Sequence, residues 1–116
     1  MTILREQGQL FNAVDLSSSQ TSTGMMLDNV KAISIQSVFS GAPNGTIKIQ
    51  CCNDLTDDPS LVVNWQDYDA ASQTVVAAGN VMWEFDPIRV KWIRLVYTRA
   101  SGSGALSSNF YSVVGA

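Results

Sequence analysis

The sequence contains no histidine, the side chain that most often serves as a general base or as a metal ligand. A Ser-His-Asp triad is therefore impossible in this chain. Neither the glycine-rich fingerprint of a dinucleotide site nor a P-loop is present. We therefore expect a protein that is not an enzyme and that has no cofactor and no metal centre.

Charge is also scarce, at 15% of residues against roughly 25% in an average soluble domain. The net charge is −3, so the chain lacks the basic footprint of a nucleic-acid-binding protein. No apolar run approaches the ~18 residues of a membrane span, and the N-terminus does not resemble a signal peptide. We expect no nucleic-acid partner and no membrane partner. Low charge suits a protein whose surface is partly covered in an assembly.

The only two cysteines, Cys51 and Cys52, are adjacent. Neighbours in a strand point to opposite faces, so these two side chains cannot easily bond to each other. Such a pair is not a disulfide framework. It predicts two reduced thiols, one of which is packed inward.

Alternation of apolar and polar residues dominates the middle of the chain. Ala32–Phe39 and Thr46–Cys51 each place apolar side chains on one face, which is typical of half-buried strands. The segment Ser40–Gly45 lies between them and contains Pro43 and an Asn-Gly pair, which favour a reversal of the chain. These features predict a β-hairpin.

A second hairpin is predicted near the C-terminus. Val90–Arg99 and Ala105–Val114 are rich in β-branched and aromatic residues, and Ser101–Gly104 joins them. Further strands are predicted at Leu10–Leu16, Leu61–Tyr68 and Asn80–Phe85, with a short one at Thr74–Ala77. Strands at this spacing indicate an all-β fold, an antiparallel β-sandwich of jelly-roll-like type.

Residues 10–116 are expected to form one β-sandwich domain. Met1–Gln9 lacks the strand pattern and is predicted to be an N-terminal arm, disordered on the isolated chain or ordered on a partner. The predicted core comprises Ile33, Ile35, Ile47, Ile49, Leu95 and Phe110.

Acidic and basic residues are unevenly placed. Seven acids and no base lie between Lys48 and Arg89, whereas four bases and no acid follow Asp86. Internal pairing of neighbouring strands and loops explains this pattern, and a bipolar surface between copies of the chain explains it as well. The oxygen-rich segment Asn53–Asp58 suits either a calcium ion or a turn whose side chains cap their own backbone.

The three tryptophans, Trp65, Trp83 and Trp92, suit either sugar stacking or burial in a core or interface. Trp92 stands beside Ile93 and so breaks the alternation of its strand. One of the two must face outward, or the strand must be covered on both sides.

Several segments together resemble a pattern of small β-sandwich virion structural proteins of bacteriophages. They are Ile35–Phe39, Gly45–Gln50, Asn53-Asp54, Trp65, Lys91–Thr98 and Gly102–Gly104. The resemblance covers roughly Ile33–Phe110 and consists mainly of strand and turn signatures. The double cysteine departs from it, since a small polar residue is expected there.

The resemblance implies a capsid decoration (cement) protein, with the major capsid protein or another virion protein as its partner. Binding only the assembled lattice would stabilise the shell. A homo-oligomer is expected, with a trimer favoured, on the exterior of the capsid of a virion assembled in the host bacterial cytoplasm. The alternative is a carbohydrate- or host-receptor-binding module of a phage fibre or spike. The contact residues expected are Arg5, Leu10, Phe11, Pro43 and Trp92.

Overall fold

The computed structural model describes residues 3–68 and 72–115. In this part of the chain the only helix is the short 3₁₀ helix η1, Pro59–Leu61. The strands are β1 (Ile3–Asp15), β2 (Gln20–Thr21), β3 (Met25–Met26), β4 (Val30–Cys52), β5 (Gln66–Asp67), β6 (Gln73–Val75), β7 (Gly79–Phe85) and β8 (Trp92–Gly115). The described residues hold no helix with the length and apolar character that a membrane crossing requires.

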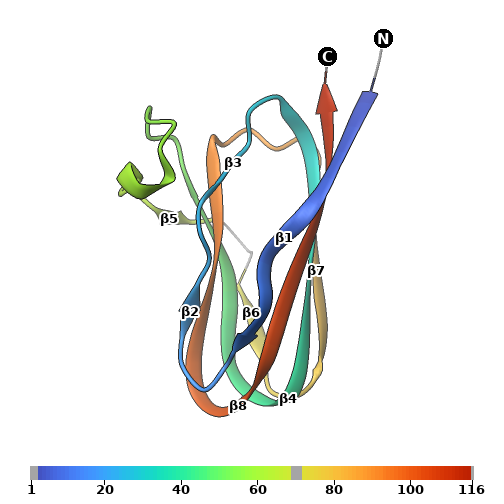
Figure 1. Ribbon diagram of the computed structural model, residues 1–116, viewed down its shortest axis with the longest axis vertical. Coiled ribbons are helices and arrows are strands. Elements are labelled where there is room, and N and C mark those ends of the chain that lie inside the picture. The colour runs from blue at the N-terminus through green and yellow to red at the C-terminus, as the bar shows by residue number, and fades with distance from the viewer. Residues whose placement is uncertain (1–2, 69–71, 116) are drawn as a thin grey trace.

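Two long strands, β4 and β8, form the backbone of the fold. They pair antiparallel from Val30 opposite Val114 to Cys52 opposite Trp92. Midway, both strands turn back together at one end of the molecule, so that the two-stranded ribbon folds over on itself (Figure 1).

Glycine makes this fold-over possible. Gly41 and Gly102 have φ values of +81° and +75°, in the left-handed region that side chains disfavour. A Cβ atom at Gly102 would also overlap the carbonyl oxygen of Ala42 on the paired strand. The two strands therefore stay hydrogen-bonded through the bend only because these positions lack side chains.

The predicted hairpins are wrong in their pairing, although the chain does reverse at both predicted places. Ala32–Phe39 does not pair with Thr46–Cys51, because both belong to the single strand β4 and pair with opposite halves of β8. The same holds for Val90–Arg99 and Ala105–Val114, which pair along β4 rather than with each other.

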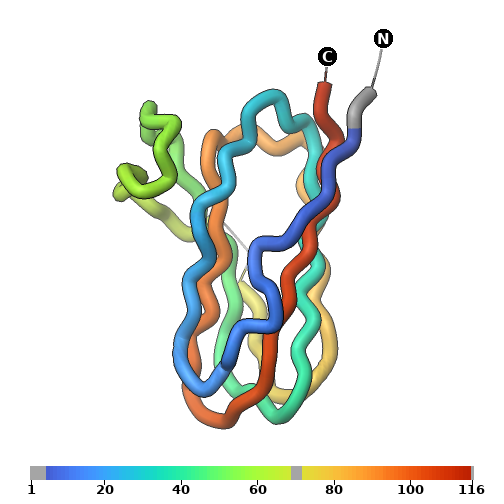
Figure 2. The backbone as a smooth tube through the Cα atoms, in the orientation of Figure 1, coloured from blue at the N-terminus to red at the C-terminus, as the bar shows by residue number. Residues whose placement is uncertain are grey.

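The folded ribbon divides the strands into two layers (Figures 1 and 2). The first layer runs β1, the second half of β8, the first half of β4, and β7. The second layer holds β2 and β3, the first half of β8, the second half of β4, and β5 and β6. This arrangement confirms the all-β class and the jelly-roll-like antiparallel sandwich.

The core lies between the layers and follows the alternation in the sequence. Ile33, Ile35, Ile47, Ile49 and Leu95 are buried, as predicted. Phe110 is only half-buried and packs against the margin of this core. Two serines on adjacent strands also face inward, and the Oγ atoms of Ser37 and Ser108 lie 2.7 Å apart in a buried hydrogen bond. A polar pair is tolerated there because one hydroxyl donates its proton to the other, so both oxygens take part in a hydrogen bond.

The N-terminal segment differs from the predicted arm. From Ile3 onward it forms the first part of β1 and pairs with the last residues of β8. Residues 1–2 lie outside the described residues. Apolar alternation is missing because β1 is an edge strand at the margin of the core and is held mainly by backbone hydrogen bonds. Gly8 lets β1 pass close to Phe110, since a Cβ atom there would stand 2.8 Å from the ring.

Other strand predictions vary in accuracy. Asn80–Phe85 is confirmed within β7, and the short strand near residue 74 is β6. The predicted strand Leu61–Tyr68 is mostly wrong, because only Gln66–Asp67 pairs with β4. The preceding residues form a loop in which Leu61 and Val63 are exposed.

Candidate interaction surface

Residues 53–65, here called the β4–β5 loop, project from one side of the sandwich (Figures 1 and 2). The loop is fixed to the body by Trp92, which is 2% exposed and packs with Cys52, Val62 and the half-buried Trp65. The indole Nε1 of Trp92 donates a hydrogen bond of 3.2 Å to the carbonyl oxygen of Thr56.

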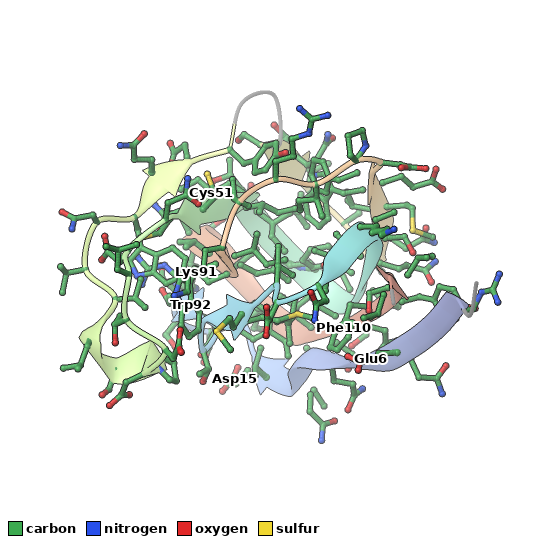
Figure 3. All side chains as sticks on the ribbon, turned by 90° about the horizontal axis from the view of Figure 1, so that it is seen from above. Glu6, Asp15, Cys51, Lys91, Trp92 and Phe110 are labelled. Atoms are coloured by element: carbon green, nitrogen blue, oxygen red, sulfur yellow. The ribbon has the colours of Figure 1, made fainter. Side chains whose placement is uncertain are left out.

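This contact explains the broken alternation at Trp92 and Ile93. Both side chains are buried, Ile93 in the main core and Trp92 in a second cluster beneath the loop. The strand is therefore covered on both sides at this point, which is one of the two solutions that the sequence allowed. Figure 3 shows Trp92 and Lys91 at the side of the molecule where the loop lies.

Asp54 organises the interior of the loop. Its carboxylate accepts hydrogen bonds from the backbone N–H of Val63 at 2.9 Å, the side-chain amide of Asn64 at 2.8 Å and the backbone N–H of Asn64 at 3.1 Å. These donors stabilise the charged form and lower the pKa of Asp54 to about 2, the backbone bond from Val63 contributing most.

The other oxygen-bearing side chains of the loop act in the same way. Asp58 caps η1 by accepting a hydrogen bond of 2.9 Å from the backbone N–H of Ser60. Asn53 accepts one of 2.8 Å from the backbone N–H of Lys91. The contacts of Asp54 and Asp58 confirm that the segment caps the backbone of its own loop. The contact of Asn53 fastens the loop to the residue that precedes β8.

Ion pairs connect the acidic middle of the chain to nearby bases. Lys91 Nζ lies 2.7 Å from Asp57 Oδ1 in the loop, and Lys48 Nζ lies 3.0 Å from Asp67 Oδ1 on β5. These pairs support the interpretation of internal pairing. Because both pairs are largely exposed, they help to orient the loop and β5 but add little to the stability of the fold.

The ordered loop presents apolar side chains to solvent. Leu55 is 94% exposed, Val63 73% and Leu61 61%, and we call these three residues the apolar tip. A groove of about 650 Å³ lies at the base of Leu55 and is also lined by Met26, Ile88 and Arg89. Exposed apolar side chains on a projecting loop are typical of interaction sites.

The structure places the five predicted contact residues differently from one another. Phe11 and Trp92 are buried within the chain, and Pro43 is fully buried at the bend, so none of the three is exposed for a contact. Leu10 is half-buried against the core. Arg5 is exposed on β1 and remains a contact candidate.

The apolar tip is not predicted from the sequence, because Leu61 and Val63 fall within the predicted strand Leu61–Tyr68. The available signal was the placement of Leu55, Leu61 and Val63 among Asp, Pro, Ser and Asn, without a strand period.

The tryptophans do not form an exposed platform. Trp83 and Trp92 are buried, which confirms their interpretation as packed aromatics. Trp65 is half-buried, and the guanidinium of Arg94 lies 4.4 Å from its ring centroid. Arg94 Nε also donates a hydrogen bond of 2.8 Å to Gln50. Arg94 therefore covers one face of the Trp65 ring through a cation–π contact, and a sugar would need an open ring face for stacking.

Two antiparallel layers that are both built on the folded ribbon of β4 and β8 define a jelly-roll-like β-sandwich. Solved structures share this fold. The SPBc2 prophage-derived protein YomS is similar with a TM-score of 0.65 and 11% identity, over 97% of this chain and 96% of that one. A chain of the infectious bursal disease virus Gx strain is similar with a TM-score of 0.55 and 14% identity, over 97% of this chain and 32% of that one.

A weaker likeness, with a TM-score of 0.49 and 9% identity, links the chain to the tobacco streak virus coat protein, over 98% of this chain and 85% of that one. No family model and no curated protein matches the sequence. At these identities the likenesses show a shared fold, one found in a prophage-derived protein and in a viral protein.

Proposed function

We propose that this chain is a non-enzymatic structural protein of a bacteriophage virion, a capsid decoration protein that stabilises the shell by bridging its subunits. The fold supports this role, because the similarity to a prophage-derived protein extends over nearly the whole of both chains. The sequence resemblance to small β-sandwich virion proteins, which consists mainly of strand and turn signatures, also supports it.

The apolar tip is the observation that carries the proposal. Leu55, Leu61 and Val63 gain nothing from their exposure in the isolated chain, yet the loop that bears them is held by capping bonds and by Trp92. Burying a leucine or valine side chain fully in a partner contributes about 1.5–3 kcal/mol. Because the loop is already ordered, little of this gain is lost to fixing its conformation.

The partner is the major capsid protein or another virion protein that offers an apolar recess to the tip. A decoration protein binds the assembled lattice and not the free subunits, so it shifts the assembly equilibrium toward the closed shell. Such binding takes place on the exterior of the virion, after synthesis in the host bacterial cytoplasm.

The alternative, a receptor-binding module of a fibre or spike, needs exposed aromatic side chains for stacking on sugars. The burial of Trp83 and Trp92 and the cover of Arg94 over Trp65 favour decoration over this alternative.

Redecoration of particles that lack the chain tests the proposal. Purified wild-type chain should bind such particles to saturation, and Leu55→Ser should lower occupancy at least tenfold at a concentration where wild type is half-saturating. Val76→Ser is the matched control, because Val76 is 71% exposed but lies outside the loop. Failure of the wild-type chain to bind particles would contradict the proposed function. Equal binding by Leu55→Ser would contradict the role of the tip.

A further inference from the structure

The outer face of the first layer is almost free of charge. Its side chains are mainly amides and hydroxyls, interrupted by the half-exposed Val38, Met82 and Tyr111. Charge stands at the margins, with Arg5 on the edge strand β1, Glu84 and Asp86 at the opposite edge, and the exposed Lys31 at the start of β4 beside Gly115. None of these four forms an ion pair with another described residue.

The strand register fixes where these side chains lie. One row across the face runs from Gln7 on β1 through Tyr111 on β8 and Ser34 on β4 to Glu84 on β7. The adjacent row runs from Gln9 through Asn109 and Gln36 to Met82. Outward side chains of one strand alternate with inward ones, so Arg5 stands one row beyond Gln7 at the same edge.

We infer that this face pairs with the same face of a second copy of the chain, about a two-fold axis that runs parallel to the strands between β4 and β8. Rotation about this axis lays β1 of each copy over β7 of the other. Gln7 then lies over Glu84, and Arg5, one row beyond, lies over Asp86 with Glu84 diagonal to it. Because the contact is isologous, the ion pair forms twice.

Size and hydrogen bonding are complementary in the same superposition. Tyr111 of each copy lies over Ser34 of the other, a large side chain over a small one, and Asn109 lies over Gln36. Amides both donate and accept hydrogen bonds, so an amide-rich face can satisfy itself in a symmetric contact.

Two hollows in the face support this match. The larger, about 550 Å³, is lined by Gln7, Ser34, Gln36 and Met82 and lies where the partner's tyrosine ring would enter. The smaller, about 240 Å³, is lined by Ser34, Glu84, Asp86 and Tyr111, at the acidic margin that would receive the partner's arginine.

The area of the face is typical of a weak contact. Four strands about 4.8 Å apart, with four outward rows about 6.8 Å apart, cover roughly 500 Å² for each copy. The total of about 1,000 Å² is at the lower limit of specific interfaces. The inference is therefore a reversible dimer, in place of the trimer that the sequence resemblance favoured.

Sedimentation velocity of the purified chain from about 10 μM to 1 mM tests this inference without any virion. Wild type should shift from monomer to dimer with concentration. Gln36→Arg places a charge at the centre of the face and should raise the dimer dissociation constant at least tenfold. Thr46→Arg is the control, because Thr46 lies in the second half of β4 and is exposed on the outer side of the second layer.

Charge exchange tests the register. Arg5→Glu and Asp86→Arg should each weaken the dimer severalfold, and the double variant should recover most of the loss, because the opposite charges meet again. The inference is overturned if wild type is monomeric at 1 mM, if it is a trimer, or if Gln36→Arg dimerises like wild type. Failure of the double variant to recover would overturn the proposed register.

Discussion

Replacing Trp92 tests whether this residue anchors the β4–β5 loop or serves as a contact residue. The indole is almost fully buried, packs with Cys52, Val62 and Trp65, and donates its N–H to the carbonyl oxygen of Thr56. Trp92→Ala removes this packing and the hydrogen bond together, whereas Trp92→Phe removes the hydrogen bond and part of the packed area.

The expected magnitude follows from the buried area. A buried tryptophan hides about 150–250 Å², which at about 25 cal/mol per Å² corresponds to roughly 4–6 kcal/mol as an upper estimate. Measured losses for Trp→Ala in cores are about 3–5 kcal/mol, and we expect Trp92→Ala to fall in this range. Trp92→Phe should cost about 1–2 kcal/mol. Leu55→Ser, on the exposed tip of the same loop, should change stability by less than about 0.5 kcal/mol.

Urea unfolding followed by far-ultraviolet circular dichroism measures all three variants under the same conditions. A loss below about 1 kcal/mol for Trp92→Ala would refute the assignment of Trp92 as an anchor. A loss for Leu55→Ser comparable to that of Trp92→Phe would show that the tip packs within the chain instead of facing solvent.

Three further predictions follow from the bend, the core and the capped carboxylate. Gly102→Ala should destabilise the fold by about 2 kcal/mol or more, measured by urea unfolding, because alanine is strained at positive φ and its methyl group overlaps the carbonyl oxygen of Ala42; wild-type stability would show that the bend is misplaced. Ile47→Ala and Ile49→Ala should each lower the free energy of unfolding by about 2–5 kcal/mol in the same assay. If both variants are nearly neutral, the inner and outer faces of β4 are assigned the wrong way round. Asp54 has its pKa lowered to about 2 from 3.8, so its contribution is complete above about pH 4 and is lost as the pH falls toward 2; acid titration of stability should be shallower for Asp54→Asn, and an unchanged slope would argue against the capping role.

The alternation of the sequence was enough to predict the core and the class of fold. Ile33 and Ile35 alternate with polar residues in one half of β4, and Ile47 and Ile49 do so in the other, and all four are buried. A period of two specifies which face a residue occupies, and that face depends little on which strand lies alongside.

Strand pairing could not be predicted in the same way. The Asn-Gly pair near Pro43 is a local signal for reversal, and the chain does reverse there, but the partner of β4 is β8, roughly sixty residues further on. A turn motif favours pairing between the two segments that flank it. No residue near the turn indicates that β4 pairs instead with the distant β8. A two-stranded ribbon that bends as a unit needs glycine on both strands, as at Gly41 and Gly102.

The contact surface was the least predictable part. Phe11, Pro43 and Trp92 are large or rigid residues that suit a contact surface and suit a core equally well, and the structure shows them buried. Arg5 retains its place because a charged side chain on an edge strand stays exposed. Leu55 was overlooked because an apolar residue in a polar loop has no periodic signal that predicts its exposure.

The copy number of the chain in purified particles tests the central claim most directly. Quantitative mass spectrometry with isotope-labelled peptides gives the molar ratio of this chain to the major shell protein after extensive washing. The account predicts a fixed ratio that matches a repeated site on the lattice. Absence from the particles, or only a few copies in each, would contradict capsid decoration, and a few copies would favour a fibre or spike.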